Sequence, residues 1–311
     1  MAQASRERWI AFLMVLPSLI LIGIFVYGFI GWTGSVSLSQ WDGVLPNYEW
    51  AGFENFKELF SLEEGGISAR RFRIDLWNTF FFTILFLLVC AVVGLMLAIL
   101  LDQKVKGEGI FRTVYLFPMA LSFVVTGVVW QWIFAPGTAN RARGVNALLD
   151  IIGLDGLKWK WYTDTGSLGP FHYALIPVII AASWQMIGYT MAMYLAGLRG
   201  IPEELREAAR VDGASEVQIY RRIIMPILAP ITLSALIVLG HISLKIFDLI
   251  FTMTGKGPGF VTDVPGIFMF ETTFQGNHYS QGAAISMIML AMVAVIIIPY
   301  LIYSMRRQVE L

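Results

Sequence analysis

The chain has 311 residues, of which 57% are hydrophobic and 14% charged, and its formal net charge is zero. With a mean hydropathy of +0.68, this composition is typical of a membrane protein and provides no basic surface for nucleic acid. The one cysteine, Cys90, excludes a disulfide framework, and the three histidines lack the spacing of metal ligands. We therefore expect a protein of the lipid bilayer that binds neither nucleic acid nor metal.

Six segments are predicted to cross the membrane as helices, because each is apolar over the roughly twenty residues that a hydrocarbon core of about 30 Å requires. The first is too long for a signal peptide and no small-residue cleavage site follows it, so we expect it to be retained. The segments form one predicted transmembrane domain, 10–305, and cover approximately residues 10–32, 77–101, 114–134, 173–195, 227–253 and 281–305.

Lys and Arg are denser in one set of connections than in the other. By the positive-inside rule the denser side is cytoplasmic. This places the N-terminus (1–9), the C-terminus (306–311) and the polar connection 199–226 in the cytoplasm. The opposite connections are long, and their tryptophans are typical either of an interfacial belt or of a docking surface, although inert spacers remain an alternative. They cover roughly residues 33–76, 135–172 and 254–280.

The connection 199–226 is too polar to enter lipid and is predicted to form two short helices joined by a sharp elbow. Pro202 suits the first helical position, and the first helix is expected to end at Asp212–Gly213. Ser215 and Gln218 are spaced as a capping box that opens a second helix, which is expected to end before Pro226. Such a shape on a membrane surface favours insertion into a partner over catalysis.

Polar side chains recur at helical intervals in the fifth predicted span and are expected to form one stripe, namely Ser234, His241, Lys245, Asp248 and Thr252. Lys245 and Asp248 are three residues apart and can pair on one helix face. Such a pair either pins neighbouring helices together or contacts a substrate, and the sequence leaves both readings open.

The third and fourth predicted spans also carry polar and aromatic faces. In the third, one face is expected to hold Met119, Ser122, Thr126 and Trp130. In the fourth, Gln185 and Tyr189 share a face, with Trp184 beside them. Together with Ser243, these side chains supply the amides, hydroxyls and aromatic rings that a sugar site needs. No arginine lies within any predicted span, which favours a neutral substrate.

The polar connection contains Glu207-Ala208-Ala209, then three residues, Gly213, nine residues, and Ile223-x-x-Pro226. This pattern resembles the EAA loop of ABC-importer permeases, with Met225 in place of the usual leucine. The resemblance implies an all-α type I permease bundle of six transmembrane helices, whose loop docks into a cleft on a cytoplasmic ATPase. The coupling residues that it implies are Glu203, Glu207, Ala208, Ala209, Asp212, Gly213 and Pro226.

Further stretches resemble carbohydrate permeases of the maltose-permease type. They include residues 51–56, 161–164 and 254–258, whereas Ser61–Ile74 has the position of an insertion. Trp184 and Tyr189 stand at matching distances before the loop, and in that family the tyrosine position lines the sugar site. Other sugar-contacting positions of the family fall on Ala182, Met186 and Ile242, so the resemblance implies the location of a site but not which sugar it binds.

The resemblance implies a permease subunit of an ATP-driven, binding-protein-dependent sugar importer in a bacterial or archaeal cytoplasmic membrane. Its implied partners are two ATPase subunits that use ATP and Mg²⁺, an extracytoplasmic sugar-binding protein and a second permease. The family favours a heterodimer, although the sequence leaves pairing with a second copy open.

We expect no enzymatic activity, because Gly255-Lys256-Gly257 lacks the glycine spacing and the Ser or Thr of a nucleotide-binding loop. One alternative is a permease of the same class for a non-sugar solute. A less favoured alternative is a transporter driven by an ion gradient. Such a transporter needs carboxylates within the membrane, and Asp248 is the only carboxylate within the predicted spans. The polar stripes argue against a purely structural subunit.

Overall fold

The computed structural model describes residues 2–61, 66–103, 105–138 and 141–309, and within these ranges the side chains of residues 9–302. Residues 62–65 of the expected insertion Ser61–Ile74 lie outside the described residues. The chain divides into two compact units. Unit 1 comprises Met1–Ala69 and Phe268–Ala291, and unit 2 comprises Arg70–Ile267 and Met292–Leu311.

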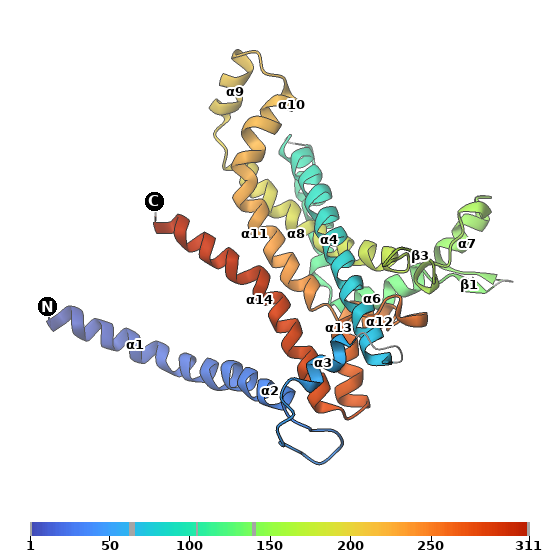
Figure 1. The fold of residues 1–311 in the computed structure, drawn as a ribbon. Coiled ribbons are helices and arrows are strands. Elements are labelled where there is room, and N and C mark those ends of the chain that lie inside the picture. Colours follow the sequence, from blue (N-terminus) through green and yellow to red (C-terminus); the bar gives the residue numbers. More distant parts are fainter. Residues whose placement is uncertain (1, 62–65, 104, 139–140, 310–311) are drawn as a thin grey trace. The chain divides into compact units, whose positions relative to one another are not determined.

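Unit 1 begins with one long helical run (Figure 1), formed by α1 (Ala2–Ile22), the π-helical η1 (Gly23–Gly28) and α2 (Phe29–Ser37). Its apolar stretch, Trp9–Ser37, is long enough to span a membrane, and none of the most apolar window is buried inside the protein. A helix that is apolar on all sides and unburied needs lipid or another apolar partner around it.

The rest of unit 1 is held together by backbone and aromatic contacts around its connecting loop. It contains α3 (Glu54–Phe60), η7 (Glu271–Gln275) and the first turns of α14 (Tyr279–Val309). Asn55 Nδ2 donates to the carbonyls of Ser37 and Ser39, both at 2.9 Å. The rings of Trp41 and Tyr279 lie 5.0 Å apart. These contacts fix the loop that follows α2 against the start of α14.

Unit 2 is built around α8 (Leu175–Arg199), of whose most apolar window 67% is buried. The unit also contains α4 (Ile67–Asp102) from Arg70 onward, and the helical run of α10 (Glu216–Ile219), η5 (Tyr220–Ile224) and α11 (Met225–Leu244). Its core includes the stacked rings of Phe82 and Phe86, 5.5 Å apart.

Small residues let the helices of unit 2 approach closely. A side chain at Gly94 would collide with Thr190 of α8. The Thr190 hydroxyl donates to the Cys90 carbonyl at 2.8 Å, a helix-to-helix hydrogen bond of the kind that Thr makes between membrane helices.

The third predicted span is bent rather than straight. Helix α5 (Glu108–Leu116) with the 3₁₀ turn η2 (Phe117–Ala120) meets α6 (Phe123–Ile133) at 101°. Ser122 is extended, and its hydroxyl caps α6 by accepting from Val125 N at 3.2 Å. The expectation that Met119 and Ser122 share a helix face with Thr126 and Trp130 is therefore wrong, because a capped helix start separates the two pairs.

The fifth predicted span is also interrupted. Helix α11 ends at Leu244, and α12 (Asp248–Met253) begins after a non-helical Phe247. The single polar stripe is therefore wrong, and within the described part of the chain Lys245 and Asp248 form no ion pair. Packing explains the break, because α12 lies so close to α6 that a side chain at Gly127 would collide with Thr252.

The long connections carry small elements of their own. Two antiparallel ladders pair β1 (Gly137–Thr138) with β2 (Arg141–Ala142), and β3 (Ser167–Leu168) with β4 (Phe171–His172), with Gly137 opposite Ala142 and Ser167 opposite His172. Between and beyond them lie α7 (Gly144–Ile151), η3 (Asp155–Leu157), η4 (Trp161–Thr163), η6 (Pro258–Phe260) and α13 (Pro265–Phe270).

The described residues contain five helices long and apolar enough to cross a membrane, and six when the bent pair counts as one span. The predicted all-α membrane architecture is therefore confirmed. At one end of unit 2, α9 (Glu203–Val211) and α10 project beyond the ends of α4 and α8 (Figure 1).

Candidate functional site

The projecting segment formed by α9, the turn 212–215 and α10, here called the hook, has the local structure that its residues predict. Helix α9 ends at Val211 with Asp212 as its C-cap, and Gly213 follows with φ +79°, the left-handed conformation that favours glycine. Ala214 N donates to Ala209 O at 2.9 Å across this turn. The predicted elbow at Asp212–Gly213 is confirmed.

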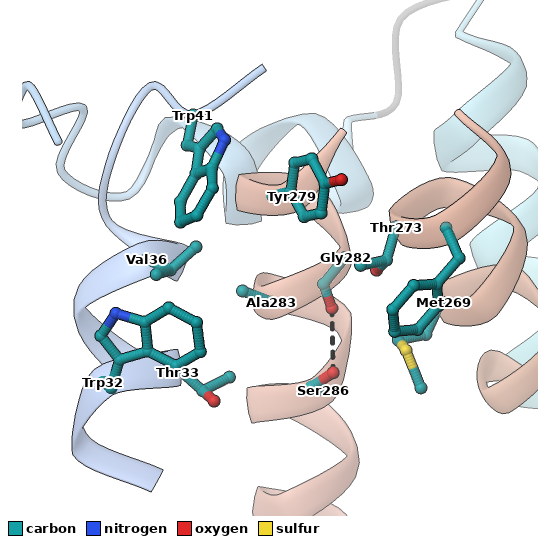
Figure 2. Close-up of a pocket in the computed structure, with 11 residues that line it drawn as sticks. Trp32, Thr33, Val36, Trp41, Met269, Thr273, Tyr279, Gly282, Ala283 and Ser286 are labelled. Atoms are coloured by element: carbon teal, nitrogen blue, oxygen red, sulfur yellow. Dashed lines mark hydrogen bonds between the residues drawn. The ribbon is translucent and has the colours of Figure 1, made fainter. Parts of the chain in front are cut away.

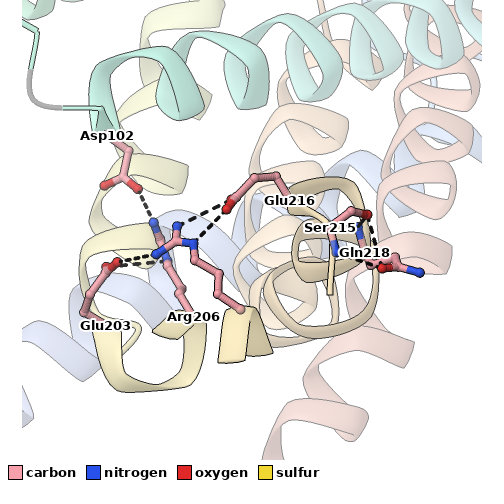
Figure 3. A network of polar contacts seen from close by, with 7 residues as sticks. Asp102, Glu203, Arg206, Ser215, Glu216 and Gln218 are labelled. Carbon is pink, nitrogen blue, oxygen red and sulfur yellow. Dashed lines mark hydrogen bonds and ion pairs between the residues drawn. The ribbon is translucent and has the colours of Figure 1, made fainter. Parts of the chain in front are cut away.

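The capping box is also confirmed. Gln218 N donates to Ser215 Oγ at 3.4 Å, and Ser215 N donates to Gln218 Oε1 at 2.8 Å (Figure 3). Two details differ from expectation. Pro202 is the N-cap of α9 rather than its first helical residue. The second helix does not end before Pro226, because η5 continues it into α11 and Pro226 lies within this continuous helical run.

The hook presents one exposed face and one buried face. Its exposed surface includes the implied coupling residues Glu203, Glu207, Ala208, Asp212 and Gly213, whereas Ala209 is buried. Pro226, the remaining implied coupling residue, is exposed but lies beyond the hook in α11. Val211 and Val217 are 87% and 76% exposed. Ala209 and Ile219 instead pack into the core of unit 2 with Leu198. Exposed valines beside carboxylates form a surface suited to a partner protein.

An exposed cluster of ion pairs links the two helices of the hook (Figure 3). Arg210 Nε lies 2.7 Å from Glu216 Oε1, and Arg210 Nη1 lies 3.5 Å from Glu203 Oε1. These carboxylates, Glu216 more than Glu203, raise the pKa of the Arg210 guanidinium above its ordinary value.

A second cation ties the hook to the membrane helices. Arg206 Nη1 lies 2.9 Å from Asp102 Oδ2 at the end of α4, and Arg206 Nη2 donates to Leu198 O in the last turn of α8 at 3.3 Å. Sequence reasoning missed Arg206 and Asp102 as site residues, because 104 residues separate them and no local pattern joins them.

Two of the predicted substrate-path residues of α8 lie beside the break between η2 and α6. Gln185 is buried, and its Nε2 donates to Leu121 O at 2.7 Å, while its Oε1 has no hydrogen-bond partner among the described residues. Trp184 is 38% exposed and packs edge-on against Trp130 at 5.7 Å. Tyr189 is half-buried on the same helix. The structure therefore brings Gln185 and Trp184 to the bend in the third span.

The other predicted substrate-path residues are distributed differently. Thr126 and Ser243 are buried, and the Ser243 hydroxyl donates to Gly240 O of its own helix at 2.9 Å. Ser122 is exposed and caps α6, and Lys245 and Asp248 are exposed at the α11–α12 break. Buried Ser243 and Thr126 are not accessible to a solute in this conformation.

Two of the cavities on the described surface are lined mainly by apolar side chains. One in unit 2, of about 370 Å³, lies among α4, α5 and α8 and includes Trp184 in its lining. The other, of about 310 Å³, lies in unit 1 (Figure 2) and is lined by α2, α14 and residues such as Trp41 and Met269. Among the predicted site residues that the structure describes, Trp184 alone lines either of these cavities.

Across residues 2–61, 66–103, 105–138 and 141–309, no three His, Cys, Asp or Glu side chains are grouped so that they could hold a metal ion.

Residues 90–307 match the family model described as "Binding-protein-dependent transport system inner membrane component". A probable ABC transporter permease protein of Pyrococcus horikoshii is 43% identical over 292 residues, which cover 94% of each chain. The xylose/arabinose import permease protein XacH of Haloferax volcanii is 36% identical over 291 residues, which cover 93% of this chain and 86% of XacH.

A solved structure shares the fold. A chain in the crystal structure of a bacterial ABC transporter involved in the import of the acidic polysaccharide alginate superposes with a TM-score of 0.78. The two chains are 23% identical and each is covered over 98% of its length. This likeness confirms the predicted bundle of the ABC-importer permease type.

Proposed function

Because the chain belongs to the family of binding-protein-dependent transport system inner membrane components, and is thus the permease subunit of an ABC importer, we propose that the solute it moves is a sugar. The chain is a multi-pass inner-membrane protein and not the catalytic subunit of its transporter, which uses ATPase and binding-protein partners. The similarity to XacH, whose name gives xylose and arabinose, supports a sugar.

The observation that carries the coupling part of this proposal is the exposed hook. Its face presents Glu207 and Val211 to the surroundings, while its opposite face is packed and ion-paired to the membrane helices. The hook is the docking element for a cytoplasmic ATPase, with Glu203, Glu207, Ala208, Asp212 and Gly213 at the contact. The positive-inside distribution supports a cytoplasmic position for the hook and for both termini.

Transport follows from two packings of the bundle that ligand and nucleotide stabilise differently. Closure of two ATPase subunits displaces the hooks of this chain and of a second, homologous permease, with which it forms a heterodimer. The solute is delivered by the binding protein to the connections 33–76, 135–172 and 254–280. It passes near Trp184 and Tyr189, where an aromatic face and a hydroxyl suit a sugar ring.

Reconstitution of the complex in proteoliposomes tests the docking role. Glu207→Lys reverses a charge for which the described residues provide no partner, so folding and membrane insertion are retained. ATP-dependent uptake is expected to fall by about ten-fold or more, the effect of about 1.4 kcal/mol or more at an interface. Lys106→Glu reverses the charge of an exposed residue that lies outside both the hook and the connections 33–76, 135–172 and 254–280, so it is the control and is expected to keep uptake. Normal uptake with Glu207→Lys would contradict the docking role.

A screen of solutes against the cognate binding protein tests the substrate class. Tight binding of a pentose, hexose or oligosaccharide supports the sugar proposal. Selective binding of an amino acid, phosphate or other non-sugar solute would replace it, while leaving the family and the docking role intact. Uptake that survives ATP depletion but is abolished by an uncoupler would contradict ATP-driven import altogether.

A further inference from the structure

One guanidinium joins the hook to two membrane helices at once. Arg206 of α9 makes an ion pair of 2.9 Å with Asp102, the last residue of α4 (Figure 3). The same side chain donates to the carbonyl of Leu198, one residue before the end of α8, at 3.3 Å. Displacement of Arg206 therefore acts directly on the ends of both helices.

The negative charge at these two helix ends favours a cation at the position that Arg206 occupies. The C-terminal end of a helix carries a partial negative charge, so an aspartate there is unfavourable unless a cation lies beside it. Arg206 provides that cation for Asp102 of α4 and also contacts the carbonyl end of α8. The side chains of Arg206 and Asp102 are 12% and 11% exposed, so water screens their attraction weakly.

The neighbouring arginine of the hook has a different arrangement. Arg210 pairs with Glu216 at 2.7 Å, but the two side chains are 46% and 59% exposed. The pair joins α9 only to α10, six residues further along the chain. An exposed pair of this kind contributes little to stability, and it contacts neither α4 nor α8.

We propose that Arg206 is a positioning residue that transmits the displacement of α9 to the ends of α4 and α8. The inference rests on the proposed docking of the hook to an ATPase. The apolar contacts of Ala209 and Ile219 keep the hook close to the core without fixing its direction of movement. The charged hydrogen bonds of Arg206 are directional, so they make the two helix ends follow the hook.

The test is the number of ATP molecules hydrolysed per solute transported by the complete complex in proteoliposomes, with binding protein present. Asp102→Asn removes the negative charge at nearly constant volume, and Asp102→Glu restores it. Glu216→Gln makes the same carboxylate-to-amide change in the exposed pair. Size-exclusion chromatography and co-purification of the ATPase subunits establish assembly for each variant.

We expect Asp102→Asn to retain the ATPase subunits. The number of ATP molecules consumed per solute should rise by about five-fold or more, because five-fold is the lower end of the effects that coupling between two sites produces. Asp102→Glu and Glu216→Gln are expected to stay within about two-fold of the unmodified complex, as for weak or retained ion pairs. Should Asp102→Asn fail to assemble, Arg206→Lys takes its place with the same expectation, because an ammonium cannot bridge two acceptors in the fork geometry of a guanidinium.

Three results would overturn the inference while leaving the docking proposal intact: an unchanged ratio with Asp102→Asn, equal losses with Asp102→Asn and Asp102→Glu, or loss of the ATPase subunits from assembled Asp102→Asn. Absence of ATPase subunits from the unmodified complex would instead overturn the docking proposal, and this inference with it.

Discussion

The side-chain amide of Gln185 in α8 donates a 2.7 Å hydrogen bond to the backbone carbonyl of Leu121, where the third span bends by 101°. A break in a membrane helix frees backbone groups that need a partner in lipid. Gln185 is such a partner, which gives it a structural role in addition to its proposed place beside the substrate path.

Replacing Gln185 by methionine removes this donor at similar volume. We expect Gln185→Met to lower the free energy of unfolding by about 1–3 kcal/mol, the cost of leaving a buried polar group unpaired. Tyr189→Phe is the control, because the Tyr189 hydroxyl has no hydrogen-bond partner in the part of the chain that the structure describes. It should change stability by less than about 0.5 kcal/mol. Denaturant unfolding in mixed micelles measures both, and equal effects would contradict the role of Gln185.

The packing of α5 against α8 depends on Gly188. A side chain there would collide with the Tyr115 carbonyl, a backbone group that cannot rotate away. Gly188→Ala is therefore expected to destabilise the protein by about 1–3 kcal/mol, as overpacking does. Gly240→Ala is the matched control, because its nearest atom, Leu87 Cδ1, would lie 4.0 Å away. It should stabilise α11 by about 0.5–1 kcal/mol. A tolerated Gly188→Ala would show that the helices separate easily.

The elbow of the hook depends on the backbone of Gly213 and not on the space around it. Its φ is +79°, and no atom lies within 4 Å of an added Cβ. Gly213→Val is expected to cost about 1–2 kcal/mol locally, to misalign α9 with α10 and to reduce ATP-dependent uptake, while insertion in the membrane is unchanged. Gly213→Asn should retain most uptake, because asparagine tolerates the left-handed conformation. Equal losses of uptake in Gly213→Val and Gly213→Asn would instead indicate that Gly213 contacts the partner protein.

Acidification is expected to destabilise unit 2 through His172. Partial burial lowers the pKa of its imidazole below the ordinary value, and its Nδ1 lies 2.8 Å from the Asn78 side-chain oxygen. Because the folded pKa lies below the unfolded one, the contribution of the neutral ring is fully present above about pH 6.5, the unfolded value. It is lost as the pH falls from there toward the folded pKa.

Thermal unfolding of the purified chain between pH 7.5 and pH 5 measures this effect. As the pH is lowered, the unfolding temperature of the unmodified protein should decrease, and that of His172→Gln should decrease less. His278→Gln is the control for loss of a histidine outside unit 2, because His278 is an exposed residue of unit 1. Identical pH profiles for His172→Gln and the unmodified protein would contradict the role of His172.

Local features of the hook could be read from the sequence because they depend on neighbours in the chain. The left-handed Gly213 and the capping box of Ser215 and Gln218 involve residues at most five positions apart. The predicted limits of the two hook helices differ from those in the structure. Pro202 is the cap of α9 rather than its first residue, and Pro226 does not stop the helix, because η5 leads into α11.

The errors lie where packing overrides helical periodicity. The expected faces in the third and fifth spans assumed continuous helices, but the chain breaks at Ser122 and after Leu244. The close contact of α6 with α12 at Gly127 determines where those breaks occur. Periodicity shows which residues share a face only while the helix continues. Lys245 and Asp248 were therefore expected to be able to pair, but they form no ion pair among the described residues.

The sequence by itself determined that this chain spans a membrane, that it carries a bent polar hook and that it resembles ABC-importer permeases, because hydropathy, turn chemistry and motif spacing are local properties. Only the tertiary structure decided which side chains connect the hook to the bundle. The Arg206–Asp102 pair joins residues 104 positions apart. Such a pair exists only because apolar packing brings the end of α4 beside α9, and no periodicity along the chain encodes that proximity.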